Sequence, residues 1–472
     1  MLDSRLEGVV SGLHVLPFLP SSSDDGFSVV DYRRVDPSLG SWNEISALGK
    51  SFDLMFDGVF NHISAESDWF RGFLRADSKY LDWFITVDGN PDLSKVVRPR
   101  TLPLLTTFET ASGPRKVWTT FSRDQVDLNV REPEVLLELL DVLLFYVERG
   151  ARFIRLDAIA YLWKEIGTSC IHLPQTHRVV QLMRTVLDTV APGVMLITET
   201  NVPHEDNISY FGDGSNEAQL VYNFALPPLV LHSLLEGNAE ALSRWASKLE
   251  LPTRKVAFLN FLASHDGIGV TPVRGILSGT EFDRLVSLVE ARGGFVSRRS
   301  NQDGSASPYE LNINFLDALT DPSDPDSEQT AIDRFLTAHA IMFAMPGLPA
   351  VYFHSLFGSR GDRAGAESSG MPRRINRQKL ARAELERELD QPGSRRSRIL
   401  RELSQLLRTR QTSPAFAPTA PAEVLALDQR VFALRRTSPD GSREAVCLHN
   451  VSDQRLRVQG HALEPYPSRW LL

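Results

Sequence analysis

The chain has 472 residues, 42% of them hydrophobic, and a formal net charge of −8. This length allows one barrel-sized core plus a small extra domain. No basic block suits a nucleic-acid backbone and no apolar run reaches the length of a membrane helix, so we expect neither as a partner. Cys170 and Cys447 indicate no disulfide framework and the N-terminus shows no signal-peptide pattern, so we expect a cytoplasmic protein.

Apolar stretches typical of buried strands recur along the chain. Seven strands are predicted, over residues 9–18, 52–60, 151–159, 194–200, 220–226, 255–265 and 348–354. Amphipathic helices are predicted between them, over residues 133–150, 176–191, 226–249 and 326–347. Continuous apolar strands that alternate with helices form parallel sheets covered by helices. Seven such strands over this length indicate an α/β fold of the (β/α)8 TIM-barrel type rather than a doubly wound sheet.

Two segments depart from this alternation. About seventy residues separate the strand at 52–60 from the helix at 133, which is too long for a plain loop. We therefore predict a small inserted domain over 63–132, with the barrel over 1–62 and 133–411. After residue 411 the pattern alternates with period two, which predicts a C-terminal antiparallel β-domain over 412–472. Just before it, residues 380–411 predict two charged helices with a solvated surface.

Acids, histidines and one arginine gather where four of the predicted strands end. In a barrel of this type the active site lies at the C-terminal strand ends. A single aspartate at such a place is commonly a helix cap, and a single histidine is commonly a core residue. Four strand ends that carry such residues together indicate a catalytic site. In chain order, the residues are Asp57, Asn61, His62, Arg155, Asp157, Glu199, His265 and Asp266.

Asp157 and Glu199 follow consecutive strands. Neighbouring strands lie about 4.8 Å apart, so the two carboxylates can converge at about 5–5.5 Å, the separation used by retaining glycosidases. One carboxylate then attacks an anomeric carbon and the other protonates the leaving oxygen. Arg155 lies two residues before Asp157, on the same face of the strand. It either forms a structural ion pair that holds the register or keeps Asp157 ionised for the reaction.

The remaining polar residues at the strand ends allow two interpretations. His62, His265 and Asp266 suit hydrogen bonding to sugar hydroxyls and support of an oxocarbenium-like transition state. Together with Asp57 they could instead form a metal site. The sequence lacks an HExxH motif and any tight histidine spacing, which disfavours the metal site. A serine-hydrolase GxSxG motif is absent as well.

Short motifs at the same strand ends resemble a known family. The segments DGVFNH, RLDAIAYLW, TETN and SHDG resemble the four short conserved regions of the α-amylase superfamily of retaining α-glucosyl enzymes. From about residue 8 to residue 411 the chain is more specifically similar to the sucrose phosphorylase subgroup, above all in RLDAIAYLWKEIGTSCIHLPQTH. Within that subgroup, VYFHSLFGSRGDRAG and GMPRRINRQKL resemble the phosphorylases that act on glucosylglycerate.

The resemblance implies roles for individual residues. It makes Asp157 the nucleophile, Glu199 the general acid/base and Asp266 the transition-state stabiliser. It implies binding of the donor glucose by Asp24, His62, Arg155, His265 and Arg377. It implies binding of phosphate or the acceptor by Arg115, His354, Arg360 and Arg374. The implied reaction transfers glucose from an α-glucoside to phosphate by double displacement, with no metal or organic cofactor.

The acceptor remains open among glycerate, fructose, fructose 6-phosphate and glycerol. Arginines grip carboxylates bidentately, so the arginines between residues 360 and 374 favour glycerate, unless they are surface or phosphate contacts. A plain α-glucosidase and an inactive carbohydrate-binding relic are further alternatives. The chain begins about eight residues before what resembles the second barrel strand. We therefore expect an absent first strand, an exposed strand edge and low stability. The sequence does not specify the oligomeric state.

Overall fold

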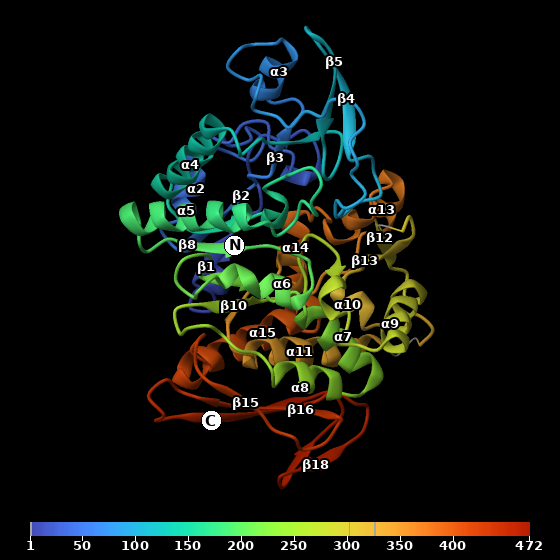
Figure 1. The fold of residues 1–472 in the computed structure, drawn as a ribbon. Coiled ribbons are helices and arrows are strands. Elements are labelled where there is room, and N and C mark those ends of the chain that lie inside the picture. Colours follow the sequence, from blue (N-terminus) through green and yellow to red (C-terminus); the bar gives the residue numbers. More distant parts are fainter. Residues whose placement is uncertain (1, 302, 325–326) are drawn as a thin grey trace. The chain divides into compact units, whose positions relative to one another are not determined.

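The computed structural model describes residues 2–301, 303–324 and 327–472. The chain forms two compact units (Figure 1). The first unit consists of the described part of residues 1–200 with Ile208–Val221 and Arg298–Ser307. The second consists of Asn201–Asn207, Tyr222–Ser297 and the described part of Pro308–Leu472.

The first unit contains a parallel sheet, helices and short antiparallel pairs. Its strands are β1 (Gly12–His14), β2 (Asp53–Gly58), β3 (His62–Ser64), β4 (Leu105–Thr110), β5 (Gly113–Trp118), β6 (Gln125–Asp127), β7 (Ala151–Leu156) and β8 (Met195–Thr198). Its helices and 3₁₀ turns are α1 (Leu2–Leu6), η1 (Asp24–Gly26), α2 (Trp42–Leu48), α3 (Asp68–Leu74), α4 (Pro133–Glu148), η2 (Ile159–Tyr161), α5 (Pro174–Val190) and η3 (Ser209–Phe211). The chain leaves this unit along β9 (Leu220–Tyr222).

The parallel strands of the first unit follow the order β1-β2-β7-β8-β9. In β2, every residue after Asp53 is buried, as expected of a strand covered on both faces. The register places Asp57 opposite Arg155 and Leu156 opposite Thr198. Asp157 and Glu199 are therefore the next residues after two paired positions on neighbouring strands.

Helices α4 and α5 begin where the sequence predicts a helix start. Each has proline in its first turn, where the missing N–H is not needed. Along α4, the buried residues Val135, Leu139, Val142 and Tyr146 recur at helical spacing and form its inward face. The predicted helices at 133–150 and 176–191 are thus confirmed within two residues at each end.

Within the first unit, residues 63–132 form α3 and the β4–β5 hairpin, which projects next to it (Figure 1). A small apolar cluster of Val87, Val96, Leu104 and Trp118 is closed by Cys170 from the loop after η2. β6 of this segment pairs with β3, joining Asp127 to His62 in the register. The domain boundaries at 63 and 132 stay a prediction.

The second unit is richer in helices. Its helices are α6 (His204–Ile208), α7 (Leu226–Glu236), α8 (Glu240–Ala246), α9 (Gly279–Ala291), α10 (Phe315–Ala318), α11 (Ser327–Ala344), α12 (Phe353–Leu356), α13 (Arg363–Ser369), α14 (Arg382–Leu389) and α15 (Arg395–Thr412). Its 3₁₀ turns are η4 (Thr271–Val273), η5 (Pro372–Asn376) and η6 (Pro414–Phe416). The parallel strands β10 (Ala257–Asn260) and β14 (Leu348–Pro349) pair with each other.

The remaining strands are antiparallel. β11 (Ile268–Gly269) pairs with Glu310 and Leu311 of β13 (Ala306–Asn312) in the second unit. β12 (Phe295–Ser300) ends, and β13 begins, within the Arg298–Ser307 segment of the first unit. At the C-terminus, β15 (Ala422–Val424), β16 (Val431–Thr437), β17 (Glu444–Asn450) and β20 (Ser468–Leu471) form an antiparallel sheet, with a β18 (Leu456–Val458) and β19 (His461–Leu463) pair. The C-terminal antiparallel strands after residue 411 were predicted from period two.

Several predicted elements of the second unit differ from the structure in their bounds. The predicted strand at 255–265 contains only the four residues of β10. The predicted helix at 226–249 is two helices, because Gly237 adopts a left-handed conformation with φ of 64° that ends α7. The predicted strand at 348–354 contains only the two residues of β14, and α12 begins at Phe353. The predicted helix at 326–347 is α11, and residue 326 lies outside the described residues.

Two further observations concern the cysteines and the helices of the described residues. Cys170 and Cys447 are both free, buried thiols. Among the described residues, no helix combines the length and the apolar character that crossing a bilayer requires.

Candidate active site

A buried arginine in the first unit lies among three carboxylates. Arg155 Nη1 lies 2.5 Å from Asp57 Oδ1 and 2.9 Å from Asp157 Oδ1. Arg155 Nη2 lies 3.8 Å from Glu199 Oε2. The Arg155 side chain is almost fully buried, whereas those of Asp157 and Glu199 are 12% and 15% exposed. A buried cation favours the ionised form of a carboxylate beside it. Asp157 is thus held as a carboxylate that stays partly accessible.

Asp57 is the innermost carboxylate of this group. Its Oδ2 lies 2.8 Å from His14 Nε2, which donates because an ionised carboxylate only accepts. Burial by itself raises the pKa of Asp57, but the charges and hydrogen bonds of His14 and Arg155 outweigh burial and hold the pKa at about 2. Asp57 therefore remains an anion at neutral pH and binds Arg155 Nη1, the nitrogen that also contacts Asp157.

Glu199 directly follows β8 and has a different environment from Asp157. Its Oε2 accepts a hydrogen bond of 3.0 Å from the backbone N–H of Ala158. Ala158 has a φ of 48°, a left-handed conformation that is uncommon for a residue with a side chain. The chain thus turns sharply after Asp157 and presents an N–H group to the carboxylate on the neighbouring strand. Two carboxylates with unequal surroundings suit two different acid–base roles.

The η1 turn brings Asp24 close to His62. Gly26 has a φ of 116°, and a Cβ there would lie 2.6 Å from the carbonyl oxygen of Pro17, so glycine is required. Gln125 Nε2 lies 3.3 Å from Asp24 Oδ2 and 3.3 Å from His62 Nε2. His62 is not at the end of β2, as predicted, but at the start of β3. Gln125 was not predicted as a site residue, although it lies between these two predicted sugar-binding residues.

The second unit holds its own cluster around Asp266. Arg373 Nη1 lies 2.8 Å and Arg377 Nη2 lies 3.1 Å from Asp266 Oδ1. His265 Nε2 lies 3.5 Å from Asp266 Oδ2. Arg377 Nε also donates to the carbonyl oxygen of His265 at 2.9 Å. His265 and Asp266 lie five and six residues beyond the end of β10 rather than at the strand end itself.

Glu310 anchors Arg373 in this cluster. The buried carboxylate of Glu310 accepts from Arg373 Nε at 3.0 Å and from Nη2 at 3.1 Å. It also accepts from the backbone N–H of Gly267 at 3.0 Å. Glu310 was not predicted as a site residue. The alternation of apolar and polar residues over 309–313 is the signal from which its strand could have been predicted.

The four residues expected to contact phosphate or the acceptor have separate surroundings. In the first unit, Arg115 lies on the exposed hairpin, 3.5 Å from Asp88. In the second unit, Arg360 pairs with Asp317 at 2.9 Å and with Glu328 at 3.2 Å. His354 is buried with Nδ1 3.0 Å from Ser359 Oγ, and burial, with the nearby Arg396 charge, lowers its pKa to about 4. Arg374 lies half-buried in η5.

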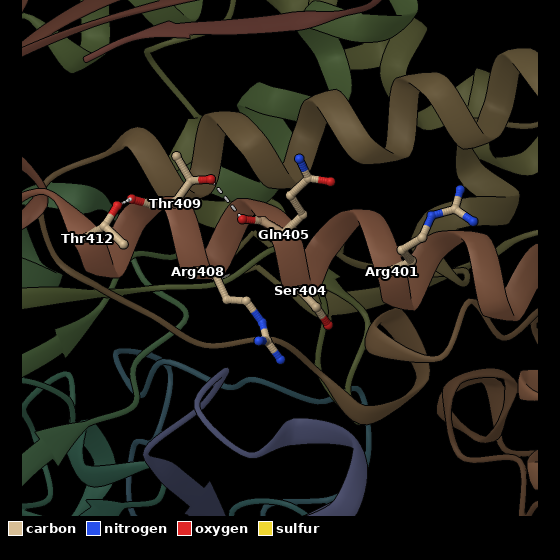
Figure 2. Close-up of a pocket in the computed structure, with 6 residues that line it drawn as sticks. All are labelled: Arg401, Ser404, Gln405, Arg408, Thr409 and Thr412. Atoms are coloured by element: carbon tan, nitrogen blue, oxygen red, sulfur yellow. Dashed lines mark hydrogen bonds between the residues drawn. The ribbon is translucent and has the colours of Figure 1, made fainter.

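A surface pocket of about 460 Å³ lies along one face of α15 in the second unit (Figure 2). Its lining comes from this helix alone, and Thr409 Oγ1 is bonded to the Gln405 carbonyl oxygen at 2.9 Å. The pocket contains none of the predicted site residues. It is lined by Arg401, Ser404, Gln405, Arg408, Thr409 and Thr412.

Comparison with known proteins identifies the family. The model of the alpha-amylase catalytic domain matches residues 8–268, more than half of the chain. The chain belongs to the alpha-amylase family. The resemblance inferred from the short motifs is therefore confirmed.

Two curated relatives of this family member are similar over three quarters or more of their own length. A glucosylglycerate phosphorylase of Allomeiothermus silvanus is 51% identical over 483 residues, which is 100% of this chain and 86% of the relative. A glucosylglycerate phosphorylase of Spirochaeta thermophila is 53% identical over 451 residues, which is 96% of this chain and 76% of the relative. The predicted enzyme class, a glycoside phosphorylase of the alpha-amylase family, is confirmed.

A solved structure supports the same fold. The crystal structure of a sucrose 6F-phosphate phosphorylase from Thermoanaerobacter thermosaccharolyticum has a TM-score of 0.83 and 26% identity. The match covers 98% of this chain and 93% of the chain in that crystal structure. The TIM-barrel class with C-terminal antiparallel strands, predicted from the alternation of strands and helices, is confirmed.

Proposed function

We propose that this phosphorylase transfers glucose from 2-O-α-glucosylglycerate to phosphate and releases glycerate and α-glucose 1-phosphate. The observation that carries the mechanism is the position of Arg155, which bonds the Asp157 carboxylate at 2.9 Å and lies 3.8 Å from Glu199. One strand-end carboxylate is thereby kept ionised beside a second one in a different environment. The choice of glucosylglycerate rests on the names of the two relatives and on the arginines near the predicted acceptor residues.

In the first step, the Asp157 carboxylate attacks the anomeric carbon of the donor glucose. The protonated Glu199 gives its proton to the glycosidic oxygen, the carbon–oxygen bond breaks, and glycerate leaves as an alcohol. A β-glucosyl ester on Asp157 results. The backbone N–H of Ala158, which bonds Glu199 Oε2 at 3.0 Å, supports its orientation.

In the second step, a phosphate oxygen attacks the anomeric carbon of the ester. Glu199, now a carboxylate, takes the proton from phosphate, and the bond to Asp157 breaks. Two inversions restore the α configuration, so the product is α-glucose 1-phosphate. Asp266 is assigned to stabilise the positive charge that develops on the sugar ring in both steps. Its two arginine partners, Arg373 and Arg377, support this role because they keep the carboxyl ionised.

Arg374 is the arginine that we assign to the carboxylate of glycerate. Arg360 and Arg373 on the same segment are already paired with carboxylates of the protein. A guanidinium group binds a carboxylate through two parallel hydrogen bonds. Arg374→Gln should therefore lower kcat/KM for glycerate by roughly tenfold, the worth of a charge-assisted pair, and leave glycerol almost unchanged. Arg382→Gln, at an exposed pair with Glu386, is the matched control.

The decisive experiment is phosphate release in the synthetic direction. The protein is mixed with α-glucose 1-phosphate and, in parallel, with glycerate, glycerol, fructose and fructose 6-phosphate. We expect release with glycerate, and none from Asp157→Ala. Asp141→Ala, which removes an exposed carboxylate paired with Arg33, should retain full activity.

Each other result has a definite meaning. Preference for fructose, fructose 6-phosphate or glycerol would replace glycerate as the acceptor and keep the phosphorylase mechanism. Release of free glucose without any acceptor requirement would make the protein an α-glucosidase. Binding of glucosides without turnover, unchanged in Asp157→Ala, would make it an inactive carbohydrate-binding relic.

We infer that the protein acts in the cytoplasm on small, soluble sugars and inorganic phosphate. The two free, buried cysteines support a reducing environment. Cell fractionation with antibody detection tests this inference. Recovery with an extracellular or envelope fraction would contradict it.

A further inference from the structure

A buried lysine in the first unit has no role in the mechanism above. Lys164 follows η2, and its side chain is 2% exposed. Its Nζ lies 2.6 Å from Asp127 Oδ2 and 2.6 Å from Asn61 Oδ1. Burial lowers the pKa of Lys164, and the Asp127 carboxylate opposes that effect. Asp127 is held in turn by the backbone N–H of Thr120 at 2.8 Å and the Thr120 hydroxyl at 2.6 Å.

Lys164 determines which way the Asn61 side-chain amide faces. An ammonium group has three donors and no acceptor, so only the amide oxygen of Asn61 can face it. The amide nitrogen then lies 3.2 Å from His62 Nδ1 and 3.3 Å from Asp127 Oδ2. Because this nitrogen is a donor, His62 Nδ1 must be the acceptor. In a neutral imidazole with an accepting Nδ1, the proton is on Nε2.

The other side of the His62 ring is consistent with this tautomer. His62 Nε2 lies 2.9 Å from the carbonyl oxygen of Phe27, which can only accept. Gln125 Oε1 accepts from the Ser122 hydroxyl at 3.0 Å, which turns Gln125 Nε2 toward the same carbonyl at 3.3 Å. Gln125 Nε2 and His62 Nε2 then lie 3.3 Å apart because both donate to the carbonyl oxygen of Phe27. The opposite tautomer would require Asn61 to present its NH₂ group to the lysine ammonium.

We propose that Lys164 is a positioning residue: through Asn61 it fixes His62 in the Nε2–H tautomer, so that the Nε2–H group, which donates to the Phe27 carbonyl oxygen, is also the donor that a hydroxyl of the bound glucosyl group shares. The contact with the glucosyl group rests on the proposed function, whereas the tautomer rests on the hydrogen bonds alone. A purely structural role, in which Lys164 only neutralises Asp127, would leave the tautomer of His62 independent of the lysine.

The charges that face His62 support a neutral ring. Burial is the largest influence and lowers the pKa of His62. Asp127 and Asp24 raise the pKa, while Lys164 lowers it. Removal of Lys164 alone should therefore raise the pKa of His62, because the two carboxylates would remain.

The direct test is ¹⁵N NMR of the protein labelled at histidine, with the His62 signals assigned by loss in His62→Gln. Long-range ¹H–¹⁵N correlations show which ring nitrogen carries the proton. The unmodified protein should show Nε2–H for His62. The double variant Lys164→Met/Asp127→Asn removes both buried charges together, so no buried ion is left unpaired. It should show the Nδ1–H tautomer in part, because the Phe27 carbonyl oxygen still favours Nε2–H.

Activity provides the second readout. The double variant should lower kcat/KM by roughly threefold to tenfold, the worth of one hydrogen bond to a neutral hydroxyl. Lys164→Met alone should also move the acidic limb of the pH profile of kcat/KM to higher pH, because the pKa of His62 rises. Glu217→Gln removes another buried partner, 2.9 Å from His177 Nδ1; it should reduce stability without altering the His62 tautomer or the pH profile.

The outcomes separate this inference from the proposed function. A parent protein with Nδ1–H on His62, or a folded double variant that keeps only Nε2–H, would overturn the role of Lys164. The expected tautomers in an enzyme inactive on glucosylglycerate would overturn the proposed function and support the role of Lys164. If the double variant does not fold, the spectrum of the parent and the pH profile of Lys164→Met still test the role of Lys164.

Discussion

A single guanidinium group organises the acidic cluster of the first unit. Arg155 contacts the carboxylates of Asp57 and Asp157 and lies near that of Glu199. The contact with Asp57 is a structural ion pair, whereas the orienting charge beside Asp157 stays a prediction. Asp57 is fully buried and forms the structural part of the pair, whereas Asp157 remains partly accessible.

Replacement of Arg155 by methionine should strongly destabilise the protein. Two carboxylates would lose their buried cationic partner, which typically costs 3–5 kcal/mol, so we expect the free energy of unfolding to fall by about 3 kcal/mol. Urea denaturation measures the change. Arg33→Met is the matched control, because Arg33 also bonds two carboxylates, Glu138 at 2.6 Å and Asp141 at 2.5 Å, but is partly exposed. Arg33→Met should lower the free energy of unfolding by less than about 1 kcal/mol. Equal losses in the two variants would contradict the stabilising role of the buried Arg155.

Asp57 should also shape the acid stability of the protein. Its pKa of about 2 in the folded state lies below the ordinary 3.8. A depressed pKa stabilises the fold above the ordinary value, and the contribution is lost as the pH falls through the folded value. Between pH 4 and pH 2, this carboxyl should account for a loss of about 2 kcal/mol of the free energy of unfolding.

The pH dependence is measured by urea denaturation of the parent and of Asp57→Asn from pH 6 downward. The variant should be less stable at pH 6 and should lose less stability below pH 4. His14→Gln removes one of the two partners that lower the pKa of Asp57. Its loss of stability with falling pH should lie between that of the parent and that of Asp57→Asn. The same slope for the parent and Asp57→Asn would contradict the assignment.

At the scale of elements, helix boundaries follow local chemistry. α9 begins with a capping box in which Ser278 and Glu281 satisfy each other's backbone N–H groups. α7 ends at Gly237, which accepts a φ of 64° without a side-chain clash. Because α8 starts only three residues later, this glycine converts one apolar helical stretch into two helices.

Gly237→Ala should therefore destabilise the protein by about 1 kcal/mol, the cost of a left-handed conformation for a residue with a Cβ. Steric overlap does not add to the cost, because the new Cβ would lie 3.6 Å from Ser452 Cβ, an ordinary contact. Gly279→Ala, at an open position at the start of α9, should be neutral or slightly stabilising. Thermal denaturation of both variants tests the prediction, and a smaller loss at Gly237 than at Gly279 would exclude it.

At the scale of the whole molecule, each unit contains helices, sheets and buried cores of its own. In the second unit, the C-terminal sheet has an apolar cluster formed by Val431, Ala433, Leu448 and Leu463. Arg436 on β16 connects this sheet to its surroundings: it is fully buried and donates to the carbonyl oxygens of Ala344 at 2.7 Å and Ala417 at 2.9 Å. The end of α11 and the β-strands are thus joined by one side chain.

Arg436→Leu should lower the free energy of unfolding by about 3 kcal/mol, because several buried carbonyl groups would lose their donor. The neighbouring residue offers the matched control. Arg435 is 40% exposed and pairs with Glu423 at 2.7 Å, so Arg435→Leu should change stability by at most about 0.5 kcal/mol. Urea denaturation followed by tryptophan fluorescence compares the two variants. Similar losses would show that Arg436 does not hold the sheet to α11.

The sequence by itself determined the fold class, the family and the order of most elements. Parallel strands buried on both faces are continuous apolar runs, and the helices between them keep the 3.6-residue period, so both are visible locally. Strand-end chemistry also appears in the sequence: Asp57, Arg155, Asp157 and Glu199 stand next to such runs. The shorter strands, the break at Gly237 and the sheet containing Glu310 were not predicted, since pairing partners and backbone conformation set these limits.

Only the tertiary structure decided which polar groups meet. Arg155 reaches Asp57 across 98 positions of the chain, Lys164 reaches Asn61 across 103, and Arg373 reaches Glu310 across 63. No local period encodes such pairs, because they depend on strand register and on the direction of each side chain in a packed core. Burial then removes water as a partner, so every one of these charges must find a protein group. The arrangement of donors and acceptors around His62 and Asp266 follows from that requirement.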